Sequence, residues 1–451
     1  MTTHTSDEAL QSGIDGGTPT RRAVLQACLV AAAGTVLGTP MRAQPSAPRR
    51  GKATSVIQIW MWGGPPHLDT FDPKPEAGGE YCGPLTTPIA TNATGMRIGE
   101  LLPLLARQAD KYALIRSMAH GINGHETASY LVQTGRQSGD GIVHPCVGSV
   151  VSLFKGHAAG YRGLVPPYVV LTQPQGRFSE AGFLGSRHKP FATGGNPAQD
   201  PFVVEGVVAP GITADRQRAR RELLHSLDTL GRAVGDDAEL AALRQSEAAA
   251  YDLILGDAGK VFDLTQETPA VRDDYGRSAF GQSCLLARRL VEKGVPYVTI
   301  NYQGWDTHKE HFQAMRRKLP EMDRGMAALL ADLAARGLLD STIVWWGGEF
   351  GRTPKVSWEA PWNGGRGHHG RVFSTLVAGG GFRGGIVLGA SDRRGEEVRD
   401  RAVGPTELIR SIYHLLGIDS SAKLPHPQGL DMRVLPELAK GDGGGLLREI
   451  L

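Results

Sequence analysis

Residues that could carry out metal-dependent or hydrolytic chemistry gather in short groups, each placed after or beside an apolar run. Four groups follow such runs: His67/Asp69/Asp72, His125/Thr127, Asp306/His308 and Glu349/Arg352. A fifth group, the adjacent His368 and His369, lies in a glycine-rich loop before an apolar run. In open α/β sheets, ligands bind outside the carboxyl ends of the strands, so groups placed in this way can meet at one edge of a sheet.

Together these groups predict a divalent metal site. A mixed set of carboxylates and imidazoles suits Zn, Mn or Fe better than Ca, which prefers oxygen ligands. The candidates suffice for one or two ions, and two-ion sites stabilise both the attacking and the leaving oxygens of an ester displacement. The predicted ligands are Asp69, Asp306, His308, Glu349 and His368, with His67 next.

The same groups also have purely structural interpretations. The loop from His67 to Asp72 could form an Asx-type turn with a solvated histidine. Asp306 or Thr307 could open the next helix as its N-cap, which is compatible with a metal role for Asp306. His311 is close in sequence to Asp306 and His308, but its side chain is expected to point in a different direction.

His125 and Thr127 are predicted near the N-terminus of a helix over residues 126–133. Free N–H groups and the dipole at such a terminus favour anions, so a phosphate or sulfate ester could be held there. Thr127 is then the candidate nucleophile, and Arg352 binds the transferred group bidentately. Alternatively, water activated by the metal attacks directly. A capped helix with exposed histidines explains these residues equally well.

The elements that must position these groups are apolar runs that alternate with helical segments. Runs rich in β-branched and aromatic residues predict buried strands over residues 55–62, 112–118, 167–172, 296–302, 342–346 and 373–378. Helices are expected over residues 101–110, 126–133, 145–154, 277–293 and 405–416. This alternation predicts an α/β fold, a doubly wound, mostly parallel sheet with helices on both faces.

Other segments carry more local expectations. Pro320 is predicted to break the helix after His308, whose second half has a core-facing apolar stripe. Residues 385–389 are predicted to form a short hairpin partner of the preceding strand. Residues 173–256 are expected to form a loop and helical insertion, with helices over 213–233 and 236–256.

Bulk composition excludes several classes of protein. Apolar residues make up 41% and charged residues 21% of the 451 positions, so the chain can bury a large core. A net charge of +3 gives no argument for binding nucleic acid. Four cysteines are too few for a disulfide framework and match no zinc spacing.

The first 43 residues are predicted to be a twin-arginine signal peptide. Arg21 and Arg22 follow a polar segment and precede an apolar stretch that is too short and weak to span a membrane. The twin arginines imply export of the folded protein by the Tat machinery, and hence a periplasmic or secreted location. Cys28 precedes the apolar run, so no lipid anchor is expected, and residues 44–451 form the mature domain.

Several stretches resemble the alkaline phosphatase-like superfamily, which includes sulfatases. Residues 322–344 resemble the segment that leads into the Asp-His metal motif of sulfatases, where this chain has Glu349-Phe350. Residues 131–136 resemble the end of the sulfatase nucleophile helix, which places the sulfatase cysteine near His125. The resemblance implies a metal-dependent ester hydrolase fold in which one histidine ligand and the usual nucleophile are replaced.

A resemblance of four separated motifs covers nearly the whole mature chain. Residues 63–75, 305–308, 348–354 and 365–369 resemble family 1501 of the domains of unknown function, whose members are commonly Tat-exported. The chain departs from that pattern at Gly367, where the family usually has Asp.

The sequence therefore predicts an exported, metal-dependent hydrolase of phosphate or sulfate esters that acts on a small-molecule or carbohydrate ester. The alternative is a non-catalytic protein that keeps the fold and binds a metal or ligand. The missing nucleophile and Gly367 favour the alternative.

Overall fold

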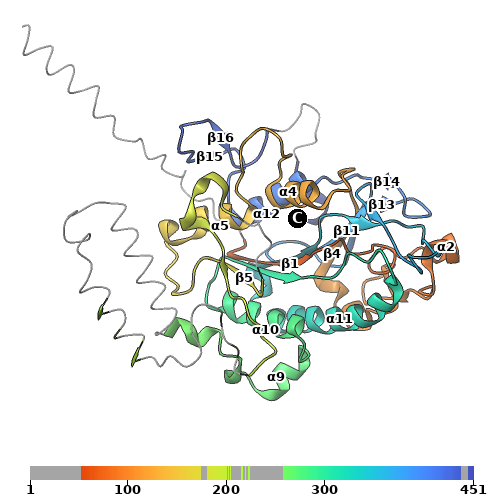
Figure 1. Cartoon of the computed structure of the whole chain (residues 1–451), viewed down its shortest axis with the longest axis horizontal. Coiled ribbons are helices and arrows are strands. Elements are labelled where there is room, and N and C mark those ends of the chain that lie inside the picture. Colours follow the sequence, from red (N-terminus) through yellow and green to blue (C-terminus); the bar gives the residue numbers. More distant parts are fainter. Residues whose placement is uncertain are drawn as a thin grey trace, which may run out of the picture. The chain divides into compact units, whose positions relative to one another are not determined.

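The protein is built around an eight-stranded sheet formed by the predicted apolar runs (Figure 1). The computed structural model describes residues 52–173, 180–200, 257–437 and 445–451, with isolated positions between 202 and 223. The strands are β1 Ser55–Met61, β4 Tyr112–Met118, β5 Tyr168–Leu171, β6 Phe191–Ala192, β7 Tyr297–Tyr302, β8 Thr342–Gly347, β11 Phe373–Ala378 and β12 Ile386–Leu388. Their order across the sheet is β12-β4-β11-β8-β1-β7-β5-β6.

Strand direction decides where the loops meet. β1 pairs in parallel with β7 and β8, whereas β11 is antiparallel to both β8 and β4. The carboxyl ends of β1, β4, β7 and β8 therefore lie at the same edge of the sheet. Because β11 runs the other way, its amino end lies at that edge too, and so does the loop that precedes it.

Helices cover both faces of the sheet. In Figure 1, α10 (Ala279–Glu292) and α11 (His311–Ala335) lie on one side, and α4 (His125–Thr134), α5 (Val147–Lys155) and α12 (Pro405–Leu416) lie on the other. Alternate residues of β1 enter the two cores: Ile57 and Ile59 pack with α10 and α11, and Val56 and Trp60 pack on the opposite face. Because both faces of the strand are buried, apolar residues occupy most of its positions and do not alternate with polar ones. The doubly wound, mostly parallel architecture predicted from the sequence is confirmed.

Shorter elements connect these layers. The short strands pair as β2 Ile89–Ala90 with β3 Arg97–Ile98, β9 Gly351–Arg352 with β10 His368–His369, β13 Ala390–Ser391 with β14 Val398–Asp400, and β15 Lys423–Leu424 with β16 Met432–Arg433. The short helices are α2 Gly79–Cys82, α3 Pro103–Ala106 and α9 Pro269–Asp274. No helix in the described ranges has the length and apolar character needed to cross a bilayer.

Three local expectations are wrong. α11 runs unbroken through Pro320, because its buried stripe extends on both sides of the proline, from Met315 to Leu333. Burying several large side chains outweighs the proline cost of about 3 kcal/mol. β12 is not a hairpin partner of β11 but pairs in parallel with β4. The predicted helix over 101–110 is reduced to α3 and a 3-10 turn, Ala109–Lys111.

The predicted insertion over residues 173–256 lies mostly outside the described residues. Within its described part, Phe191–Ala192 forms β6, the edge strand beside β5. The helices expected over 213–233 and 236–256, and the signal peptide over 1–43, lie outside the described ranges apart from isolated positions in the first helix.

Asp323 of α11 gives the fold a pH dependence that can be tested. Its buried carboxylate accepts hydrogen bonds from the N–H groups of Leu104 (2.9 Å) and Leu105 (2.7 Å) at the start of α3. Burial raises the pKa of Asp323 from 3.8 to about 6, and these hydrogen bonds only partly oppose the rise. Between these values the folded protein binds more protons than the unfolded chain, so this contribution to stability is present at low pH and is lost as pH rises.

We expect Asp323→Asn to remove the pH-dependent contribution of Asp323 to the unfolding free energy. Relative to the variant, the wild-type protein should lose roughly 2 to 3 kcal/mol of unfolding free energy between about pH 4 and pH 7. Urea unfolding at a series of pH values measures the difference. The control is Asp340→Asn, because Asp340 is exposed. Parallel pH curves for the wild type and Asp323→Asn would contradict the prediction.

Candidate metal centre

Two parts of the chain bring Asp306, His308 and His368 together at the edge where β7 ends. Asp306 and His308 follow β7, and His368 begins β10. Asp306 Oδ1 lies 3.0 Å from His308 Nε2 and 3.1 Å from His368 Nε2, and the two imidazole nitrogens are 2.9 Å apart. The antiparallel direction of β11 places the loop that carries His368 at this edge of the sheet.

The spacing of these atoms fits a shared cation. Ligand atoms held tetrahedrally at about 2.0 to 2.1 Å from a zinc ion stand about 3.3 Å apart. The three atoms of this triangle are nearly at that separation, and two imidazole nitrogens this close need a proton or a cation between them. A second group among the described residues, His125, Asp306 and His368, also has potential ligand atoms within 4.8 Å of one another, so the two groups share Asp306 and His368. The structure thus contains a candidate metal site.

His125 and Glu349 form a second layer of the same cluster. His125 opens α4, and its Nδ1 lies 2.7 Å from Oε1 of Glu349, which is fully buried. The same Glu349 oxygen accepts a hydrogen bond from the Gly63 N–H group (2.9 Å). The ring is thereby oriented with Nε2 towards Asp306 Oδ2, 3.4 Å away. Glu349 Oε2 is buried without a hydrogen-bond partner, which leaves a carboxylate oxygen available to a cation or water.

Charge interactions shift the proton affinities in the cluster. Partial burial acts to raise the pKa of Asp306, but the hydrogen bond and charge of Arg352 outweigh it and lower that pKa to about 2. The hydrogen bond to Glu349 raises the pKa of His125, and burial opposes this rise. Burial is also the main cause that lowers the pKa of His308. Asp306 is therefore an anion and His308 a neutral ligand at neutral pH, as metal binding requires.

Arg352 does not have the role predicted for it. Its guanidinium is buried and donates to the carbonyl oxygens of Gly63, Gly64 and Arg366, as well as to Asp306. Binding a transferred group bidentately would require breaking these hydrogen bonds in the interior. Arg352 instead holds Asp306 in place, which is a correction to the expectation from the sequence.

Asp69 also lies elsewhere than predicted. Its carboxylate is buried and paired with the Arg366 guanidinium (Nε to Oδ2, 3.0 Å) and with His311 Nε2 (2.8 Å). His311 Nδ1 in turn lies 2.6 Å from the Thr307 hydroxyl, next to Asp306 in the chain. With both oxygens engaged in a buried ion pair, Asp69 positions the cluster and does not join it.

His67 and Asp72 are likewise engaged away from the cluster. His67 Nε2 lies 2.8 Å from the Gly395 carbonyl oxygen, and its ring stacks on that of His369 at a centroid distance of 6.0 Å. Asp72 pairs with Lys74 (3.0 Å) and accepts a hydrogen bond from Ser391. The loop after β1 therefore anchors the segment after β13, a structural role that its residue types alone did not reveal.

Thr127 is exposed in the first turn of α4, and its hydroxyl donates to the Gly124 carbonyl oxygen (3.2 Å). Within the described part of the chain it has no hydrogen bond to the cluster. The residue at the start of the helix that does contact the cluster is His125.

Some residues of the site were missed or undervalued in the sequence. Phe350 stacks on His368 (4.6 Å between centroids) and contacts the His125 ring (5.0 Å), so it forms an apolar wall where sulfatases have a histidine. His120 Nε2 lies 2.7 Å from the Glu349 carbonyl oxygen and fixes that loop. Arg366 and His311 are the two buried partners of the Asp69 carboxylate. Their only sequence signal was proximity to predicted ligands.

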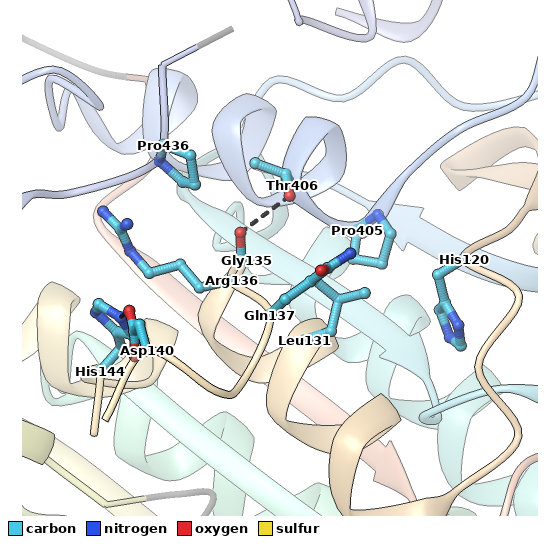
Figure 2. Close-up of a pocket in the computed structure, with 10 residues that line it drawn as sticks. All are labelled: His120, Leu131, Gly135, Arg136, Gln137, Asp140, His144, Pro405, Thr406 and Pro436. Atoms are coloured by element: carbon cyan, nitrogen blue, oxygen red, sulfur yellow. Dashed lines mark hydrogen bonds and ion pairs between the residues drawn. The ribbon is translucent and has the colours of Figure 1, made fainter. Parts of the chain in front are cut away.

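A cavity of about 420 Å³ lies apart from the metal cluster, between the end of α4 and the start of α12 (Figure 2). It is lined by His120, Leu131, Gly135, Arg136, Gln137, Asp140, His144, Pro405, Thr406 and Pro436. Of these residues, His120 alone has a hydrogen bond to a residue of the cluster, through the Glu349 carbonyl. The cavity therefore does not mark the candidate metal centre.

Comparisons with known proteins give a family match and weak structural similarities. The family described as "Protein of unknown function (DUF1501)" matches residues 53–440. No curated protein matches the chain.

Among solved structures, a protein in the alkaline phosphatase superfamily from Vibrio parahaemolyticus is 10% identical, with a TM-score of 0.39 over 84% of this chain and 72% of that one. The 2-O GAG sulfatase BT1596 is 10% identical, with a TM-score of 0.36 over 83% and 72% of the two chains. The C-terminal periplasmic domain of EcEptC from Escherichia coli, in complex with Zn, is 9% identical, with a TM-score of 0.34 over 86% and 90%. These values are too low to transfer a site or a reaction to this chain.

The positioning role of Asp69 predicts a large stability effect that does not depend on metal. Asp69→Asn should lower the unfolding free energy of chelator-treated protein by about 3 to 5 kcal/mol, because it leaves the Arg366 guanidinium buried and unpaired. Denaturant unfolding in excess chelator measures this loss.

Glu397→Gln is the control, since Glu397 pairs with Arg371 at the surface and should contribute less than about 1 kcal/mol. If Asp69→Asn costs stability only in metal-loaded protein, Asp69 is a ligand and the assignment is wrong.

Proposed function

This chain belongs to the DUF1501 family, and because that family's description assigns no reaction, we propose its function from its own residues: it is an exported, metal-dependent hydrolase of phosphate or sulfate esters. The observation that carries the proposal is the triangle of Asp306 Oδ1, His308 Nε2 and His368 Nε2, with 2.9 to 3.1 Å between its atoms. The paired arginines at 21 and 22 support export by the Tat route to the periplasm or beyond.

Asp306, His308 and His368 would hold the ion, and Glu349, whose Oε2 has no hydrogen-bond partner, is linked to them through His125. Two imidazoles favour Zn, Mn or Fe over Ca. When bound, the ion supplies the positive charge that attracts an anionic ester and stabilises charge on the departing oxygen. The N-terminus of α4 adds to this attraction, because no side chain caps its first N–H groups.

His125 is placed to move the proton of the reaction. Glu349 fixes its Nδ1, so Nε2 faces the cluster and can accept a proton from an attacking water. The water oxygen bonds to phosphorus or sulfur as the bond to the ester oxygen breaks, and the proton taken up by His125 is returned to that oxygen, so that an alcohol and a free phosphate or sulfate are released. Direct attack by water is favoured over a Thr127 nucleophile, because the Thr127 hydroxyl is bonded to Gly124 at the exposed start of the helix.

One observation favours a second function, a metal- or ligand-binding protein without turnover. The position at the start of α4 carries an imidazole where a hydrolase with a covalent step needs a hydroxyl or thiol. Binding and turnover must therefore be measured separately.

Metal binding is tested by a matched pair of adjacent histidines. His368→Ala should lower affinity for zinc at least tenfold, because it removes one of three clustered ligands. His369→Gln should retain wild-type affinity, because His369 Nε2 is directed to the Glu396 carbonyl (2.9 Å). Calorimetric titration of chelator-treated protein with zinc measures the zinc affinity of both variants. Equal affinities in the two variants would rule out the proposed centre.

Turnover is tested at His125. His125→Gln should reduce the hydrolysis rate of phosphate and sulfate monoesters, expressed per bound metal ion, by roughly 100-fold or more. Initial rates over a broad ester panel, with elemental analysis of the same samples, give the answer. Absence of hydrolysis by metal-loaded wild-type protein would leave the binding protein as the function.

A further inference from the structure

Two exposed tryptophans, Trp358 and Trp362, lie in the loop that joins β9 to β10, and Trp362 lies beside the metal cluster. Their side chains are 50% and 38% exposed, respectively. The ring centroid of Trp362 is 6.3 Å from that of His308, one of the three clustered ligands. Large aromatic side chains are mostly buried in folded proteins, so a pair left in solvent next to a polar site marks a binding surface.

The Trp358 indole and the backbone of Trp362 are held in this position by contacts with neighbouring segments. Trp358 stacks on Phe312 of α11, with centroids 5.7 Å apart and planes at 19°. The Trp362 carbonyl oxygen accepts a hydrogen bond from the Glu310 N–H group (3.1 Å). At Gly365, a Cβ atom would stand 1.7 Å from the His308 carbonyl oxygen, so the loop lies directly against the backbone that carries the ligand. A ligand that binds a rigid surface loses little affinity to ordering it.

The groups around the indoles are polar and open to solvent. Glu359 and Asn363 are exposed next to the tryptophans in the chain, and Glu310, whose N–H group donates to the Trp362 carbonyl oxygen, is exposed as well. A flat aromatic face with polar groups at its rim suits a pyranose ring, which presents C–H groups on its face and hydroxyls at its edge. An aryl group would instead favour an enclosed apolar slot.

We propose that Trp358 and Trp362 bind a pyranose ring, so that the ester held at the metal cluster belongs to a carbohydrate phosphate or sulfate. A ring stacked on Trp362 lies next to His308 and can present an ester substituent to Asp306 and His368. The identity of the reacting group rests on the proposed hydrolase function, whereas binding of the ring does not require turnover.

The test measures binding and hydrolysis with the same ligands. The probes are phosphate and sulfate monoesters of glucose, galactose, mannose and N-acetylglucosamine, with ethyl phosphate and ethyl sulfate as esters that lack a ring. Trp362→Ala should weaken binding of the best sugar ester about tenfold and raise its KM similarly, with kcat changed less than threefold. Trp362→Phe keeps a flat ring and should recover most of the loss. Binding of the ethyl esters should be the same in all three proteins.

Leu164→Ala is the control, since Leu164 is 56% exposed elsewhere on the chain. Thermal unfolding and zinc content of each variant establish that the fold and cluster are intact. The proposal is overturned if no sugar ester binds the wild-type protein more tightly than the ethyl esters. It is also overturned if Trp362→Ala weakens binding of the sugar esters and of the ethyl esters by the same factor. If sugar esters bind in a tryptophan-dependent way but are not hydrolysed, the proposed sugar-binding role of the tryptophans is upheld and the proposed hydrolase function is rejected.

Discussion

The buried carboxylate of Asp69 is the constraint on which the site depends. Taken out of water, it must be paired, and it is paired with Arg366 and His311. Both partners then fix the cluster: His311 through the Thr307 hydroxyl, and Arg366 through its backbone. The Arg366 N–H group donates to the Thr307 carbonyl, and its own carbonyl accepts from Arg352, which holds Asp306. An ion pair remote from the chemistry thus sets the position of the residues that carry it.

Strand direction is the second constraint. Parallel strands deliver the segments after β4, β7 and β8 to one edge, and the antiparallel β11 delivers the segment before it to the same edge. The short pairing of His368 with Arg352 across β9 and β10 then fixes the last ligand against the others. A fully parallel sheet would have placed the start of β11, and with it His368, at the opposite edge of the sheet. The single reversed strand is therefore what completes the three-ligand cluster.

The strands and the convergence of Asp306, His308, His125, Glu349 and His368 could be predicted, because strand-end positions follow from hydrophobic runs and parallel topology. The roles of Asp69 and Arg352 could not. A carboxylate that binds a cation and one that pairs with a buried guanidinium have the same residue type and spacing, and only burial and partners separate them. The continuity of α11 through Pro320 likewise depended on packing that the local proline signal does not include. Helices expected within residues 213–256 stay predictions.

The occupied guanidinium of Arg352 has a consequence for the chemistry. Three of its contacts are carbonyl oxygens and the fourth is Asp306, so its charge is already matched within the protein. An anionic ester arriving at the cluster would meet the carboxylates of Asp306 and Glu349 and gain little from this arginine. Under the proposed function, attraction would come from a cation held by Asp306, His308 and His368, aided by the uncapped start of α4. Asp306, which repels an anion in the absence of a cation, is also a proposed metal ligand, so under the proposed function substrate binding and metal binding would be coupled by charge.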